Sequence, residues 1–183
     1  ALEIDPNDID SLIGKGTAAG WSSTLANFRL KEMQVTFEKA LANIPDDELK
    51  ESRIEEAIIS LGTISLAMCN VAVSHLQEFG IDVEYGAMDT ISLNKQQESE
   101  WHSHIDQVMA ALIYGINLSN EVGANDEIKG ILYSNFFGVS GCVLNELTLS
   151  HPDFSVQKVF VKSNPGLTSV VGDVLDSILE DAK

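Results

Sequence analysis

The most hydrophobic part of the chain is an uncharged segment that runs from Ala57 to Leu76, with ionisable residues dense just before it and Glu78 just after it. A helix that is apolar on nearly all sides is either a membrane span or the buried centre of a helical bundle. Polar residues spread around this helix, such as Asn70 and His75, and no Trp, Tyr or basic cluster flanks it, which favours the buried centre. The pattern therefore predicts a long central helix over residues 48–79.

Two further amphipathic helices are predicted before the central one, and three after it. The helix that ends near Pro45 has apolar residues at spacings of three and four: Ala26, Leu30, Met33, Phe37, Ala40 and Ile44. After the central helix, residues 80–93 contain two glycines and no helical period, which is typical of a functional or disordered loop. A helix over 94–122 follows, with a tight turn at Gly123, whose neighbours Asn125 and Asp126 suit the N-cap of the next helix.

The C-terminal part predicts a fifth helix over 126–149 and a sixth helix that starts at Pro165. Residues 154–161 fit a helical turn or a short strand, and we expect the turn. Small residues on the fifth helix predict a close contact with the central helix through a matching set: Ser134, Gly138, Gly141 and Cys142 against Gly62, Ser65 and Cys69. The fold class predicted is an all-α bundle of about six helices in one domain, 1–183, around the central helix.

The first part of the chain carries a repeated helix ending. The second helix ends with an aromatic residue, an Ala-Leu pair and then a proline, which are Phe37, Ala40, Leu41 and Pro45. A similar sequence, ALEIDP, ends at Pro6. Leu12, Gly16 and Ala19 lie between the two prolines, and Met33 occurs four residues before the aromatic residue.

Residues 1–45 with this pattern resemble the tetratricopeptide repeat, in which pairs of antiparallel helices stack and bind peptides. The resemblance implies a helical hairpin over 1–45, merging into a bundle over 46–183. Pro6 and Pro45 are farther apart than the family period of about 34 residues, so either the first helix or the turn containing Trp21 to Thr24 is expected to be longer than usual. The resemblance also implies that the natural protein continues upstream and that this chain is a fragment of that protein.

The net charge of the chain indicates which kinds of partner it is expected to bind. The 183 residues include 28 acidic and 11 basic ones, for a net charge of −17, so nucleic acid and anionic membrane surfaces are disfavoured. A basic or amphipathic protein partner would instead be attracted. The two cysteines, Cys69 and Cys142, lie in apolar helical patterns, and the first residues lack an apolar leader, which together indicate a reducing, cytoplasmic location.

The best candidate for chemistry is a metal site at Glu98, His102 and Asp106, which are spaced four residues apart on the predicted helix. His104 would point to the opposite side, and the alternative is a row of surface pairs. The sequence contains no nucleophile-elbow, phosphate-loop or dinucleotide-binding motif, so neither a catalytic residue nor a cofactor is expected.

The resulting interpretation is a non-catalytic interaction or scaffold module that binds a protein or peptide. Candidate partner-binding residues on the hairpin are Lys15, Trp21, Arg29 and Lys31. The alternative is a metal- or small-molecule-binding bundle, including an enzyme, that uses Glu98, His102 and Asp106. A third alternative is self-association through the small-residue face.

Overall fold

The computed structural model describes residues 6–45, 49–79, 90–92, 95–140, 146–151, 154–160 and 165–181. They form six helices and three short strands, in the order α1 (Ile9–Trp21), α2 (Leu30–Leu41), α3 (Lys50–Phe79), β1 (Thr90–Ser92), α4 (Lys95–Glu121), α5 (Asp126–Ser140), β2 (Glu146–His151), β3 (Phe154–Phe160) and α6 (Pro165–Asp181). The predicted six-helix fold around a long central helix is confirmed. The expected tail of a preceding helix, residues 1–5, lies outside the described residues.

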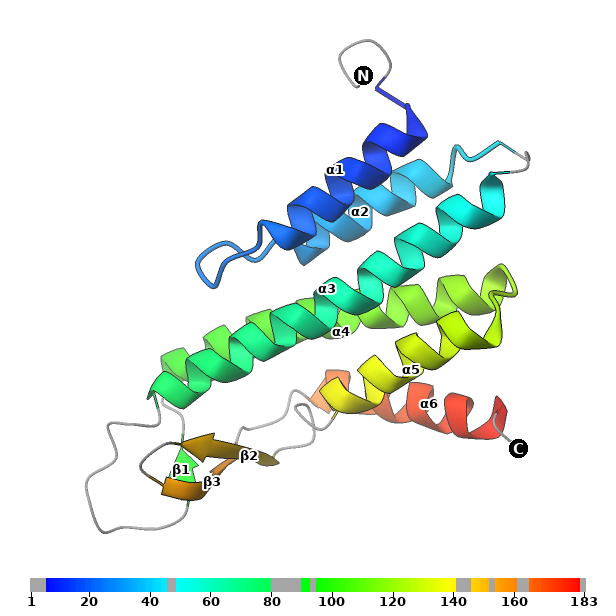
Figure 1. Ribbon diagram of the computed structural model, residues 1–183. Coiled ribbons are helices and arrows are strands. Elements are labelled where there is room, and N and C mark those ends of the chain that lie inside the picture. Colours follow the sequence, from blue (N-terminus) through cyan, green and yellow to red (C-terminus); the bar gives the residue numbers. More distant parts are fainter. Residues whose placement is uncertain are drawn as a thin grey trace.

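The helices are arranged around the antiparallel pair of α3 and α4 (Figure 1). The hairpin of α1 and α2 packs on one side of this pair, and α5 packs against both α3 and α4 on the other. Helix α6 follows α5 at the edge of the bundle. Because α3 contacts α1, α2, α4 and α5, it is the central helix of the fold.

Helix α3 buries one broad face rather than its whole circumference. The buried face consists of Ile54, Ala57, Ile58, Leu61, Gly62, Ile64, Ser65, Met68, Cys69 and Ala72. Ile59 and Val71 are exposed on the other side, and Leu66 is only half-buried, so the prediction of a helix buried nearly all round is wrong in this respect. By length and composition, Lys50–His75 could also cross a membrane: its apolar window has a mean hydropathy of 1.8, and half of that window is buried.

The α1–α2 hairpin owes its close packing to two glycines. A Cβ atom on Gly16 would lie 2.5 Å from Cε1 of the buried Phe37, and one on Gly20 would lie 2.6 Å from Sδ of Met33. The predicted stripe on α2 is largely confirmed, because Leu30, Met33, Phe37 and Ala40 are all buried. Two members of the stripe lie outside α2: Ala26 is exposed in the long loop between the helices, and Ile44 follows the end of α2 and is only half-buried.

Polar contacts attach the hairpin to the rest of the bundle. Nε of Arg53 on α3 donates to Oδ1 of Asp10 on α1 at 3.0 Å, and Thr17 Oγ1 donates to Ser60 Oγ at 3.5 Å. These contacts supplement the buried side chains of α1 and α2 that face α3 and α4.

The turn between α4 and α5 forms as predicted. Gly123 has a φ of 67°, a left-handed conformation that glycine adopts without steric cost. The N–H of Ala124 donates to Ser119 O at 2.9 Å and that of Gly123 donates to Asn120 O at 3.3 Å, which caps α4 in a Schellman motif. Oδ1 of Asn125 then accepts from the N–H of Ile128 at 3.0 Å and caps α5.

The contact between α3 and α5 differs from the predicted one. Leu132 of α5 fits between two glycines, Gly62 of α3 and Gly115 of α4. A Cβ atom added to Gly62 would lie 3.1 Å from Cδ2 of Leu132, and one added to Gly115 would lie 3.2 Å from it. Ser134 and Gly138 face away from α3 and are exposed, while Gly141 and Cys142 lie outside the described residues. Gly62 therefore does allow a close helix contact, but its partner is a leucine.

The C-terminal part contains a small sheet where helix was expected. Helix α5 ends at Ser140, and 146–151, expected to lie partly in that helix, form β2. Residues 154–160 form β3 rather than a helical turn; β3 pairs antiparallel with β2 and parallel with β1, in the order β1-β3-β2. The stretch ELTLSH alternates apolar and polar residues, and FSVQKVF does so over its first four residues, a period of two that favours strands.

Candidate functional site

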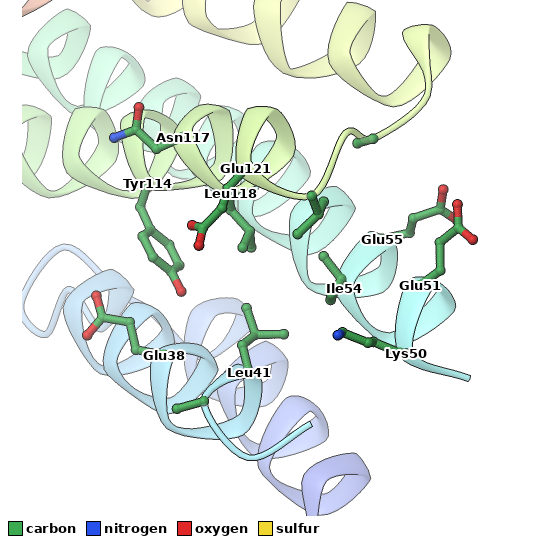
Figure 2. Close-up of a pocket in the computed structure, with 13 residues that line it drawn as sticks. Glu38, Leu41, Lys50, Glu51, Ile54, Glu55, Tyr114, Asn117, Leu118 and Glu121 are labelled. Carbon is green, nitrogen blue, oxygen red and sulfur yellow. The ribbon is translucent and has the colours of Figure 1, made fainter. Parts of the chain in front are cut away.

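A groove of about 940 Å³ lies where the C-terminal ends of α2 and α4 meet the beginning of α3 (Figure 2). Three segments that are far apart in the sequence form its walls. Helix α2 and the residue after it contribute Glu38, Leu41 and Ala42; α3 contributes Lys50, Glu51, Ile54 and Glu55; and α4 with the following turn contributes Tyr114, Asn117, Leu118, Glu121, Val122 and Ala124. The groove thus runs along the seam between the hairpin and the central helix pair.

The floor of the groove is apolar and continuous with the core. Ile54 and Leu118 belong to the buried core, and Leu41 packs against it. Val122 stands at the rim with 42% of its surface exposed. Apolar surface that is open to solvent beside a packed core gains free energy when another apolar group covers it.

The rim of the groove is acidic. Glu38, Glu51, Glu55 and Glu121 line it, and among the described lining residues the only basic one is Lys50. The C-terminal ends of α2 and α4 add the negative poles of two helix dipoles, and the beginning of α3 adds one positive pole. A cation is therefore favoured in the groove and an anion is disfavoured.

Tyr114 lies in a negatively charged environment at one end of the groove. Its side chain projects from α4 toward α2 beside Glu38 (Figure 2). Burial of the phenol, together with the negative charges of Glu38 and Glu121, raises the pKa of Tyr114 to about 12. The hydroxyl is therefore neutral at physiological pH, and two carboxylates from different helices act on the same small region.

The candidate metal ligands are spread along one helix in the described part of the chain. Glu98, His102 and Asp106 lie along one side of α4, and eight residues of helix separate the outer two by about 12 Å along the axis. Within the described residues no three His, Cys, Asp or Glu side chains gather closely enough to hold a metal ion. Glu98, His102 and Asp106 are half-buried, and the buried Oδ1 of Asp106 has no hydrogen-bond partner among the residues that the structure describes.

His104, on the other side of α4, is a packing residue. It is buried, its ring stacks on Phe28 with centroids 4.5 Å apart, and Nε2 lies 3.1 Å from Leu25 O in the α1–α2 loop. Burial is the largest effect on His104 and lowers its pKa, and the charge of His75 lowers it further, against opposing effects of the hydrogen bond to Leu25 O and of Glu100. The neutral imidazole thus links the hairpin loop to α4.

The candidate partner-binding residues lie away from the groove. Lys15, Trp21 and Lys31 are exposed on α1 and at the start of α2, whereas the groove involves the end of α2. Arg29 forms an ion pair with Glu32, its Nε donating at 2.8 Å and Nη2 at 2.9 Å. None of the four lines the groove.

Comparison with protein-family models, with curated proteins and with solved structures finds no match to this chain. The groove is therefore the feature of this chain that bears on its function. Sequence reasoning missed the groove because its walls come from three separate segments. A local signal was present on α4, where Tyr114, Leu118 and Glu121 follow one another at helical spacing beside the core stripe.

Proposed function

We propose that this chain is a non-catalytic helical interaction module that binds a basic, amphipathic segment of a protein partner in the groove. The observation that carries this proposal is the combination of an apolar floor, formed by Leu41, Ile54 and Leu118, with an acidic rim. Binding sites commonly combine an apolar surface with a few polar groups that orient the ligand.

Both parts of the groove contribute to the proposed binding. Covering the floor removes apolar surface from water, which stabilises a complex by about 25 cal/mol per Å². The acidic rim favours basic side chains around that apolar contact, and the net charge of −17 speeds their approach over longer distances. Acidic partners are repelled by the same charges, so the groove also selects between partners.

Two further features support a binding role rather than a catalytic one. The described residues that line the groove include no His, Cys, Ser or Thr, so these residues offer no nucleophile and base pair of the usual kind. Residues 1–45 resemble a repeat family whose members bind peptides, and the described part of this segment is a helical hairpin that forms one wall of the groove.

The test is calorimetric titration with a designed amphipathic peptide of about four helical turns, with Leu on one face and Lys elsewhere. A version with Glu in place of every Lys is the matched peptide control. We expect the Lys peptide to bind and the Glu peptide not to bind. Absence of binding by the Lys peptide at low ionic strength would contradict the proposal.

A pair of protein variants locates the binding. Val122→Arg places a positive charge at the groove rim, whereas Ile59→Arg places the same charge on the outer face of α3, at a residue of equal exposure, 43% against 42%. We expect Val122→Arg to weaken binding at least about tenfold, which is about 1.4 kcal/mol, and Ile59→Arg to leave it nearly unchanged. Equal effects of the two variants would mean that the peptide binds to the acidic surface in general.

A further inference from the structure

The two ends of the groove differ chemically. At one end Tyr114 lies with Glu38 and Glu121, and at the other end Lys50 accompanies Glu51 and Glu55 (Figure 2). The apolar floor lies between these ends. A ligand with one basic and one apolar part therefore has a preferred direction in the groove.

From this asymmetry we propose that the occupant is an amphipathic helix of a partner protein, with an arginine against Tyr114 and its apolar face on the floor. The inference rests on the proposed function and adds the identity and position of the basic side chain. A guanidinium group suits this end because it can stack on an aromatic ring while its N–H groups donate to carboxylates on two sides. Glu38 on α2 and Glu121 on α4 supply those two sides.

The shape of the groove favours a helix over an extended chain. Its walls are helices, and the floor residues Leu41, Ile54 and Leu118 come from three different ones. A helix lays side chains spaced three and four residues apart into such a groove and satisfies its own backbone hydrogen bonds. An extended segment would need a row of backbone partners along its length, and helical walls offer unpaired N–H and C=O groups only at the helix ends.

The basic group belongs at the Tyr114 end for an electrostatic reason. Tyr114 is half-buried, and the negative charges of Glu38 and Glu121 both act on its hydroxyl. A guanidinium placed there is attracted by both carboxylates and by the face of the ring. At the other end of the groove Lys50 offsets part of the negative charge of Glu51 and Glu55, so a cation is attracted less strongly there.

The experiment uses the full chain and three peptides that share one Leu face and differ at a single terminal position: Arg, Lys or Gln. We expect the affinities to fall in that order, with the Arg peptide about five- to tenfold tighter than the Gln peptide. Each peptide is titrated against Glu38→Gln, Glu121→Gln and Tyr114→Leu. Glu51→Gln removes the same charge at the other end of the groove and is the matched control.

The variants at the Tyr114 end are expected to weaken the Arg peptide about two- to fivefold each and the Gln peptide hardly at all. Glu51→Gln is expected to affect both peptides equally. If the peptides bind and Val122→Arg blocks them, but the Arg and Gln peptides respond alike to every variant, the arginine position is refuted while the interaction module stands. If no peptide binds, the proposed function itself fails.

A fourth peptide tests the helical conformation. It carries a proline in the middle of the Arg peptide, which breaks the helix but keeps the other side chains. We expect it to bind at least about tenfold more weakly, since proline costs about 3 kcal/mol inside a helix. Unchanged affinity would overturn the helical part of the inference.

Discussion

Alanine at Gly16 should destabilise the protein, whereas alanine at Gly14, two residues earlier on the same helix, should stabilise it. Both substitutions remove a glycine from the interior of α1. A Cβ atom on Gly14 meets nothing within 4 Å, but one on Gly16 would lie 2.5 Å from Cε1 and 2.6 Å from Cδ1 of Phe37. The two variants therefore share a gain in helix propensity and differ in packing.

The magnitude follows from these two terms. Replacing an interior glycine by alanine favours the helix by about 1 kcal/mol, and Gly14→Ala should show this gain directly. Carbon atoms in contact normally lie about 3.5 Å or more apart, so Gly16→Ala requires the seam between α1 and α2 to open by about 1 Å. Phe37 is fully buried and cannot move into solvent. Overpacking of this kind costs about 1–3 kcal/mol, so Gly16→Ala should end about 0–2 kcal/mol below the wild type.

Urea denaturation followed by circular dichroism measures both free energies of unfolding. We expect the two variants to differ by about 1–3 kcal/mol, or about 2–12 °C in thermal midpoint for a chain of this size. The slope of the transition should stay unchanged, because neither variant alters the surface exposed on unfolding. If Gly16→Ala proves at least as stable as Gly14→Ala, the close contact between Gly16 and Phe37 is not present in the folded protein.

Three other predictions concern the core. Gly62→Leu should lower the free energy of unfolding by about 1–3 kcal/mol, because its side chain would enter the space of Leu132; an unchanged urea midpoint would contradict the α3–α5 contact. Met68→Ala should cost about 2–5 kcal/mol, since Met68 is buried, and Leu66→Ala clearly less, since Leu66 is half-buried; the same urea experiment ranks them. Burial holds the pKa of His104 below its ordinary value, so the imidazole takes up a proton more readily in the unfolded chain than in the folded one. The contribution of His104 to the free energy of unfolding should therefore be full above about pH 6.5 and fall as the pH drops through that value. His104→Gln should remove that part of the pH dependence, and a wild type equally stable at about pH 7.5 and pH 6 would contradict the buried neutral imidazole.

The helices could be predicted from the sequence because their signals are local. The stripe that includes Met33 and Phe37 repeats every three or four residues, and Gly123 and Asn125 mark the end of one helix and the start of the next. Such signals depend on residues within one or two turns of each other. The central helix could be predicted from its uncharged segment for the same reason. Its exposed side could not be predicted, because exposure depends on which neighbouring helices cover it.

The sheet and the α5 contact were missed because long-range packing decides them. Residues 154–160 alternate weakly, and their strand forms by pairing with 146–151 and with Thr90–Ser92, which lies far away in the sequence. Gly138 shows the second difficulty: a small residue fits both a close helix contact and an exposed surface, and here it is exposed. Leu132, rather than Gly138, faces Gly62.

The groove was beyond sequence reasoning for a geometric reason. Whether Glu38, Tyr114 and Glu121 come together depends on how the hairpin is placed on the α3–α4 pair. That placement is set by tertiary contacts such as the one between His104 and the α1–α2 loop. No periodicity in the sequence encodes it.

Because the groove lies on the seam between the hairpin and the α3–α4 pair, ligand binding in the groove is coupled to local opening of that seam. One wall belongs to α2 and the others to α3 and α4, so the groove ceases to exist whenever the hairpin separates from the bundle. A ligand that binds only the closed form shifts this equilibrium by mass action, by about 2.7 kcal/mol at a concentration of 100 times its Kd. Amide hydrogen exchange in α1 and α2 would then slow on binding, even in α1, which touches no ligand.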